Sequence, residues 1–599
     1  MFESAAYAIL HTHPSSKEFA ISSYQAPLSD MTFNLFDVWQ LDKYWQSNEQ
    51  LQELIEAETA KAILEEAAKI CEQQIAPFAG EADQRGAQLA DGKVSLPEHY
   101  HTAYQSLVEG GWTSLSGDPQ YGGMGMPKAL SMMIDEMLCS ADIAFSLYPG
   151  LTAGACVALL QHADEQTKET YLPKLYSGEW SGTMCLTESH AGSDLGIMRT
   201  SAKPNEDGSY ALNGSKIFIT AGEHELTSNI IHLVLAKLPD APAGSRGISL
   251  FLVPKFLLDN DGEPSTRNRV NVGSIEHKMG INGSATCVLN FDDAKGYLIG
   301  EPHRGLSCMF TMMNYERLSM GSQGLGAAER AYQNALAYAK ERLQGRITEH
   351  NANKAEPIIG HPDVQRMLLN IKAMNEAGRT FATWVASLLD KSKYDNCIVS
   401  AQRANLLTPI TKAFMTDQGL DACVTAQQVF GGHGYVREWG MEQLVRDVRI
   451  AQIYEGTNGI QAADFMLRKV AYDKGSVLLD LLDDINNELL SQPDTMSGQL
   501  SNNITQLRQL TTELLQRDNT VLAGAACDFM AMVAYVLYGY MWYKNVQALD
   551  ESKHSAGLID GKNHTAKWYF NRILPRVNGL RETLLNDTSA LYGLQPEGY

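Results

Sequence analysis

The stretch that organises this chain is Arg449-Ile450-Ala451-Gln452-Ile453-Tyr454-Glu455-Gly456-Thr457-Asn458-Gly459-Ile460-Gln461. It places one carboxylate, Glu455, between an apolar segment and a turn with two glycines. Glycine lets the backbone adopt positive φ and approach a ligand closely. Apolar neighbours raise the pKa of a carboxylate by desolvation, which suits a base for a weakly acidic proton. Taken alone, the stretch favours an ordinary surface glutamate at a helix end, followed by a glycine-containing turn.

Composition excludes several classes of function. The 599 residues are 44% hydrophobic and 20% charged, which is typical of a globular protein with several domains and a large core. The net charge of −22 argues against nucleic acid and anionic lipid as partners. Nine cysteines without a Cys-x-x-Cys pair indicate core thiols in a reducing compartment. No histidine pair has further ligands at metal spacing, so no metal site is predicted.

Two features bear on location. No basic segment followed by a long apolar run stands at the N-terminus, so we expect a cytoplasmic protein. Residues 521–543 are nearly uncharged and long enough to span a bilayer. They include Asp528, which would cost roughly 2.5–3.5 kcal/mol at a helix centre in lipid. Their small residues suit close packing, so the sequence predicts a buried helix, with membrane contact as the alternative.

Hydrophobic periodicity predicts an α+β fold that is mostly α. Helical periods cover residues 49–75, 97–109, 128–144 and 152–162. Short β-branched runs follow, at 209–212, 216–220, 230–237, 248–254 and 285–291, with a turn predicted at Leu212-Asn213-Gly214. The helical period then returns from about 306 to 473, where Gly321, Gly324 and Gly326 should permit close helix packing. A last helical block is entered through a polar loop at 491–499.

These patterns divide the chain into five parts. We expect an N-terminal extension, an N-terminal helical domain, a middle β domain, a C-terminal helical domain that carries Glu455, and an additional helical domain. The predicted ranges are 1–49, 50–182, 183–300, 301–474 and 475–599. No Gly-x-Gly-x-x-Gly follows a strand, so a dinucleotide-binding fold is a poor fit.

Three further stretches accompany Glu455 in a fixed order. They are Met184-Cys185-Leu186-Thr187-Glu188-Ser189-His190-Ala191-Gly192-Ser193-Asp194, Asn213-Gly214-Ser215-Lys216-Ile217-Phe218-Ile219-Thr220-Ala221-Gly222 and Gln428-Val429-Phe430-Gly431-Gly432-His433-Gly434-Tyr435. Each alone could be a hydroxyl-bearing turn, a strand or a tight connection. Together they resemble the acyl-CoA dehydrogenase family of flavoproteins over residues 50–475. The leader and the helical tail resemble a longer subfamily.

This resemblance implies a fold and a reaction. The middle domain would be a β-barrel or sheet, and the C-terminal domain a four-helix bundle. The cofactor would be FAD, and an acyl-CoA would be oxidised to the trans-2-enoyl-CoA, as in fatty acid β-oxidation. A carboxylate would take the α-proton and flavin N5 the β-hydride. An electron-transfer flavoprotein would be the electron acceptor and the protein a homodimer.

The resemblance also assigns residues. Glu455 matches the base. The matches to FAD contacts are Met184, Leu186, Thr187, Phe218, Ile219, Thr220, Arg342, Gln428, Gly432 and Thr457. The matches to substrate contacts are Ser193, Arg317, Tyr454 and Gly456. Some FAD contacts would come from the partner subunit.

Several points stay open at this stage. Some family members carry the base on an earlier helix, where Glu316 stands here, so Glu316 is the second candidate for the base. The run Leu343-Gln344-Gly345-Arg346, Pro362 and Gly459 depart from the family pattern on the adenosine side of FAD. A flavin-dependent acyl-CoA oxidase and a non-catalytic CoA- or flavin-binding protein are the alternative functions.

Overall fold

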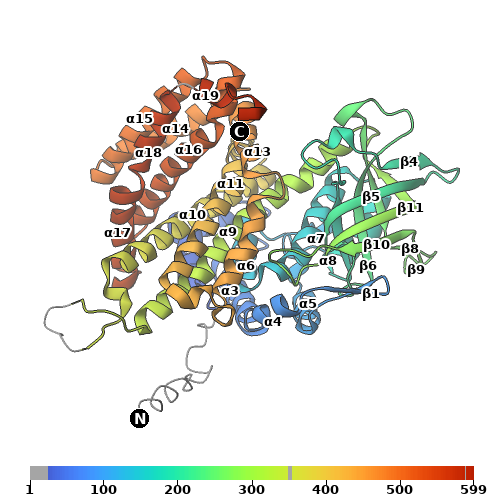
Figure 1. The fold of residues 1–599 in the computed structure, drawn as a ribbon, viewed down its shortest axis with the longest axis horizontal. Coiled ribbons are helices and arrows are strands. Elements are labelled where there is room, and N and C mark those ends of the chain that lie inside the picture. Colours follow the sequence, from blue (N-terminus) through green and yellow to red (C-terminus); the bar gives the residue numbers. More distant parts are fainter. Residues whose placement is uncertain (1–23, 348–353, 587, 599) are drawn as a thin grey trace, which may run out of the picture.

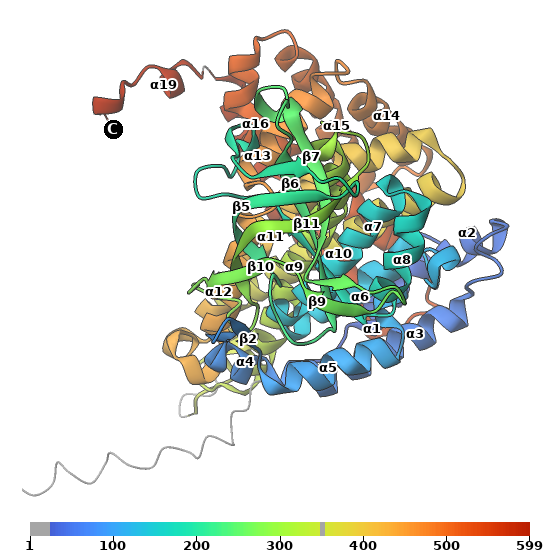
Figure 2. The same cartoon turned by 90° about the vertical axis from the view of Figure 1, so that its right-hand side faces the viewer.

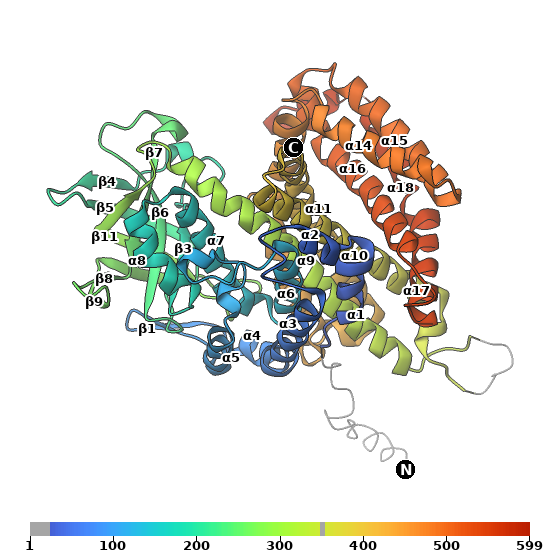
Figure 3. The same cartoon turned by 180° about the vertical axis from the view of Figure 1, so that it is seen from behind.

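The computed structural model describes residues 24–347, 354–586 and 588–598. Three masses lie side by side in Figure 1: a β domain, a central helical bundle and a block of C-terminal helices. Figure 3 shows the same arrangement from behind, with the first helices of the chain against the bundle. This order of helix, sheet and helix confirms the predicted α+β, mostly α fold.

The leader packs as part of the bundle. It contains α1 (Leu28–Thr32), a π-helical segment (Phe33–Val38) and α2 (Leu41–Ser47). Met31, Leu35 and Trp45 are fully buried in the main core. The predicted extension at 1–49 is described only from residue 24, and its first 23 residues lie outside the described part of the chain.

The N-terminal helices differ from the predicted ones at one junction. Asp142 ends α6 and caps α7, because its side chain accepts from the N–H groups of Ala144 and Phe145. The helix predicted at 128–144 therefore stops early, and the one predicted from 152 begins at Ile143. The observed bounds are α3 (Ala57–Ile70), α4 (Ala79–Arg85), α5 (Glu98–Glu109), α6 (Lys128–Ala141), α7 (Ile143–His162) and α8 (Glu165–Tyr176).

The middle domain is a 7-stranded sheet that closes on itself. The long strand β11 pairs with β5 along most of its length and with β7 at its end. The ring then closes through the pairs β7 with β6, β6 with β4, and β4 with β5. This ring is the predicted barrel, and Figure 2 shows it in front of the bundle. The strands are β3 (Trp180–Cys185), β4 (Ser201–Pro204), β5 (Tyr210–Thr220), β6 (Asn229–Lys237), β7 (Ile248–Pro254), β10 (Val270–Ile275) and β11 (Thr286–Ile299). Two small hairpins add β1 (Gln88–Ala90) with β2 (Lys93–Ser95), and β8 (Phe256–Leu258) with β9 (Pro264–Arg267).

The turn predicted at Leu212-Asn213-Gly214 is wrong. Strand β5 runs straight through these residues, and Gly214 pairs with Phe291 of β11. A Cβ atom at Gly214 would stand 2.4 Å from Thr200 Oγ1, just before β4. The glycine thus permits close approach of a neighbouring backbone rather than a turn.

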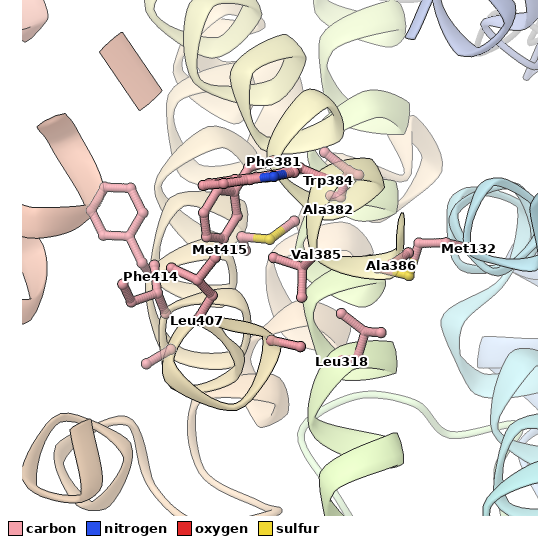
Figure 4. Packing of buried hydrophobic residues seen from close by; sticks show 14 of the residues in the cluster. Met132, Leu318, Phe381, Ala382, Trp384, Val385, Ala386, Leu407, Phe414 and Met415 are labelled. Atoms are coloured by element: carbon pink, nitrogen blue, oxygen red, sulfur yellow. The ribbon is translucent and has the colours of Figure 1, made fainter. Parts of the chain in front are cut away.

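The bundle is built on three long helices, α9 (Gly305–Glu341), α10 (Pro362–Tyr394) and α11 (Ile398–Val429). Figure 4 shows Leu318 of α9, Val385 of α10 and Leu407 of α11 in one apolar core. A Cβ at Gly324 would lie 2.4 Å from Met415 O, which confirms that this glycine permits close packing of α9 on α11.

The C-terminal helices cover α10 and α11. After α12 (Met441–Arg449), α13 (Asn458–Ala463) and a π-helical segment (Asp464–Val470) come α14 (Ser476–Ser491), α15 (Thr495–Leu514), α16 (Asn519–Gln547), α17 (Ala556–Trp568), α18 (Arg576–Leu585) and α19 (Ser589–Tyr592). The polar loop predicted at the entry to this block lies inside it, between α14 and α15. In the described chain, α7 and α16 are long and apolar enough to cross a membrane, but most of each is buried in the protein. The predicted burial of residues 521–543 is thereby confirmed.

Candidate active site

Glu455 lies on a strained turn between α12 and α13. Its φ is 54°, in the left-handed region that a side chain with a Cβ rarely adopts. Such strain persists only where the surrounding structure holds it. The next residue, Gly456, also has positive φ, and the side chain of Thr457 then caps α13 by accepting from Ile460 N–H.

Two buried side chains hold this turn in place. Gln461 Nε2 donates to the carbonyl oxygen of Glu455 at 3.0 Å. Lys412 Nζ, from α11, donates to the carbonyl oxygen of Gly456 at 2.8 Å and to Asn458 Oδ1 at 2.8 Å. Gln461 and Lys412 are both fully buried. Neither residue is recognisable as an anchor from the sequence, where only the turn itself indicates that anchors are needed.

One oxygen of the Glu455 carboxylate has no hydrogen-bond partner in the described part of the chain. Among the described residues, none hydrogen-bonds its buried Oε2 atom. Burial raises the pKa of Glu455 to about 7, although the positive charges of Arg317 and Lys412 lower it. Arg317 itself donates to Asn314 Oδ1 at 3.2 Å. A carboxylate that titrates near neutral pH and has a free oxygen is suited to remove a proton.

Glu316, the second candidate for the base, lies close by on α9. It is 1% exposed, and its Oε1 atom has no hydrogen-bond partner among the described residues. Burial and the negative charge of Glu455 raise the pKa of Glu316 well above its ordinary value. The two main charges acting on Glu455, those of Arg317 and Lys412, favour its ionised form. Burial and the charge of Glu455 instead favour the protonated form of Glu316, so Glu455 is the better candidate for the base.

The predicted flavin face is formed by the ends of β3 and β5. Thr187 O accepts from Ile217 N–H at 2.9 Å, which ties the two segments together. Opposite Val288, β5 carries an extra residue, so that Ile217 and Phe218 form a β-bulge. Phe218 has a φ of 59°, and 59% of its surface is exposed. A bulge re-aims a side chain, and this one turns a large ring outward at a strained position.

The surroundings of Phe218 fit a planar aromatic cofactor. Thr187, Thr220 and Met184 on the same two segments are half-buried, while Leu186 and Ile219 are buried. An exposed aromatic ring offers a stacking surface, and the threonine hydroxyls of these segments offer polar groups. The following loop, with the exposed Ser193, is held by Glu188. That buried carboxylate accepts from Thr200 N–H and from Lys216 Nζ, each at 3.0 Å.

The remaining predicted FAD residues lie elsewhere. Arg342 follows the C-terminal end of α9, about seven helical turns or roughly 37 Å from Arg317. Gln428 and Gly432 stand at that same end, because Tyr338 of α9 hydrogen-bonds His433 at 2.9 Å and stacks on Phe430. A Cβ at Gly432 would meet no atom within 4 Å. One chain therefore holds these residues far from the part of α9 that carries Arg317.

A cavity lies between α5, α6, α7 and α9, and one of its lining residues is hydrogen-bonded to Tyr454, the neighbour of Glu455. Glu316 and Gln323 line it, and Tyr454 O–H donates to Gln323 Oε1 at 2.5 Å. The other lining residues include Trp112, Ser131, Asp135, Gly150, Tyr315 and Ser319. In the described part of the chain, no group of three or more His, Cys, Asp or Glu side chains is placed to hold a metal.

Comparisons with known proteins agree with this geometry. Three family models match in order: the N-terminal, middle and C-terminal domains of acyl-CoA dehydrogenase, at residues 57–179, 183–294 and 303–468. A fourth, described as acetyl-CoA dehydrogenase C-terminal like, matches residues 481–595.

Relatives extend the match over the whole chain. A 3-methylmercaptopropionyl-CoA dehydrogenase of Ruegeria pomeroyi is 46% identical over 76% of this chain and 77% of its own length. The broad-specificity linear acyl-CoA dehydrogenase FadE5 of Mycobacterium tuberculosis is 33% identical over 95% of this chain and 99% of its own. A solved acyl-CoA dehydrogenase of Bacillus anthracis, complexed with FAD, has the same fold, with a TM-score of 0.74 at 21% identity over 90% of each chain. The chain thus belongs to the acyl-CoA dehydrogenase family, whose enzymes use FAD.

Proposed function

We propose that this enzyme oxidises an acyl-CoA between Cα and Cβ to the trans-2-enoyl-CoA, with Glu455 as the base that removes the α-proton. The observation that carries the proposal is the state of Glu455. It sits on an anchored left-handed turn, has a free buried oxygen, and has a pKa of about 7. The name of the Ruegeria relative supports a short acyl group, with or without a thioether, as the substrate class.

The chain's own residues then have distinct tasks. Bound FAD supplies the hydride acceptor. Phe218, Thr187 and Thr220 would hold its ring system at the exposed ends of β3 and β5. The backbone N–H of Glu455 polarises the thioester carbonyl, which increases the acidity of the α-proton. Lys412 and Gln461 hold the turn so that this donor and the carboxylate keep their positions.

The separation of the FAD residues supports a homodimer. Arg342, Gln428 and Gly432 stand roughly 37 Å from the region of Arg317 along α9, so a second copy of the chain would supply them to each flavin site. Light scattering should give the mass of a dimer; a monomer with bound FAD would contradict this assignment. We further propose that the reduced enzyme passes its electrons to an electron-transfer flavoprotein. The enzyme would act in the cytoplasm, in fatty acid oxidation.

Anaerobic absorbance titration with acyl-CoAs tests the reaction and the base together. Glu455→Gln should bind acyl-CoA but reduce the flavin at least about 10³-fold more slowly, since the base is lost. Glu316→Gln is the matched control and should still reduce the flavin. Loss of reduction in Glu316→Gln alone would make Glu316 the base. Fast reaction of the reduced wild type with oxygen would favour an oxidase.

A further inference from the structure

Gly154 of α7 leaves room for the carboxyl group of Glu316, a residue of α9 that lines the cavity between α5, α6, α7 and α9. A Cβ at Gly154 would stand only 2.3 Å from Glu316 Oε1, so the carboxyl occupies the space that a side chain would fill. The same Oε1 atom has no hydrogen-bond partner among the described residues, although the side chain is almost fully buried. Buried polar atoms are normally paired, and an exception of this kind calls for a functional reason.

Burial and the charged groups around Glu316 favour its neutral form. Glu455 and Asp135 disfavour its ionised form, and Lys128 is the cation that opposes them. Lys128 Nζ, however, already donates to Asp135 Oδ2 at 2.9 Å and contacts Tyr315 O–H at 3.3 Å. Burial is the largest cause that raises the pKa of Glu316 well above its ordinary value, ahead of these charges. A neutral carboxylic acid carries an O–H donor as well as an acceptor oxygen.

This donor distinguishes two kinds of acyl group. An alkyl chain in the cavity would leave the O–H of Glu316 buried and unpaired, which is unfavourable. An acyl chain with a sulfur or oxygen atom just beyond Cβ presents an acceptor instead. Other hydrogen-bonding side chains also line the cavity, among them Ser131, Ser319 and Gln323.

We propose that Glu316 is a specificity-determining residue that donates a hydrogen bond to a sulfur or oxygen atom in the acyl chain. The enzyme then prefers short heteroatom-containing acyl-CoAs over alkyl acyl-CoAs of the same length. This inference rests on the proposed acyl-CoA dehydrogenation, since it concerns the substrate of that reaction.

The test compares 3-methylmercaptopropionyl-CoA with pentanoyl-CoA, which has a methylene in place of the sulfur. The ratio of their kcat/KM values should exceed one in the wild type. It should fall about tenfold in Glu316→Leu, the effect of one hydrogen bond, and stay within about threefold in Glu316→Gln, which keeps a donor. An unchanged ratio in Glu316→Leu overturns the inference. If neither compound reduces the wild-type flavin, the proposed function fails instead.

Difference infrared spectroscopy separates recognition from a structural role. In Glu455→Gln, where the bound substrate does not react, Glu316 should give the C=O band of a protonated carboxyl at neutral pH. The double variant Glu455→Gln/Glu316→Gln should lack that band, which would assign the band to Glu316. The thioether substrate should shift the band and pentanoyl-CoA should not. Absence of the band, or equal shifts with both compounds, overturns the inference.

Discussion

The helical bundle holds two groups of ionisable side chains that differ in their hydrogen bonding. The ions around Arg379 are paired with one another, whereas among the described residues the carboxyls of Glu455 and Glu316 are not. Arg379 Nε donates to both oxygens of Glu136 at 3.0 Å, and its Nη2 donates to Glu329 at 2.8 Å. In contrast, Glu455 and Glu316 each keep an oxygen without a partner among the described residues. Paired charges hold segments together, whereas carboxyl groups with an unpartnered oxygen remain available for chemistry.

The Arg379 cluster also joins the two ends of the described chain. Arg379 and Lys562 of α17 both contact the carboxylate of Asp30 in α1. Lys562 Nζ donates further to Glu376 at 2.9 Å. Burial would raise the pKa of Asp30, but Lys562 and Arg379 outweigh it and hold that pKa below its ordinary value. The leader and the C-terminal helices are thus locked onto α10 through charge.

The largest effect on stability should come from breaking this cluster. Arg379→Met leaves Glu136 and Glu329 buried without their cation, which should cost about 3–5 kcal/mol in the free energy of unfolding. Denaturant titration followed by circular dichroism measures the loss. The matched control is Arg403→Met, which breaks a solvent-exposed pair with Asp484 and should cost less than about 1 kcal/mol. Equal losses in both variants would refute the contrast.

The sequence predicts the turn of Glu455 better than it predicts the ion pairs around Arg379. Glu455 and its glycine turn are local, so they could be recognised within a few residues. The anchors of that turn could not, since Lys412 stands on a long helix whose pattern gives it no special place. Gly214 was read as a turn, but its role depends on how close Thr200 of another segment comes. Likewise, the pairing of Asp30 with Lys562 joins positions 532 residues apart and follows only from the packed fold.

The anchor of the base should be the next most sensitive element. Lys412→Met removes the donor to Gly456 O and one of the two cations near Glu455. Displacement of the turn should reduce the rate of flavin reduction about 100-fold. Stopped-flow absorbance measures this rate. Lys469→Met, which loses a contact with Asn405 on the surface, is the control and should stay within threefold. A normal rate in Lys412→Met would show that the turn needs no anchor.

The pH dependence of kcat/KM tests whether Glu455 is the unpaired group that reacts. Burial raises the pKa of Glu455 to about 7 in the folded protein, so the base is protonated and inactive below that pH. The kcat/KM value should therefore rise with pH, about tenfold per unit below 7, and level off above it. Loss of the Lys412 cation should move the midpoint upward, because that charge lowers the pKa. A midpoint near 4.5 in the wild type would mean that Glu455 is solvated in the working enzyme.

The smallest effect should come from the hydrogen bond between Tyr454 and Gln323, which links the turn to the cavity wall. Tyr454→Phe keeps the ring but leaves Gln323 Oε1 without its donor, a cost of about 1 kcal/mol or roughly fivefold in rate. The bond positions the turn from only one side, while Lys412 and Gln461 still hold both carbonyls. Single-turnover kinetics with Tyr454→Phe and Lys412→Met side by side ranks the two contacts. If Tyr454→Phe lost more rate than Lys412→Met, the turn would be held mainly from the cavity side, and the hydrogen bonds of Lys412 would be secondary to it.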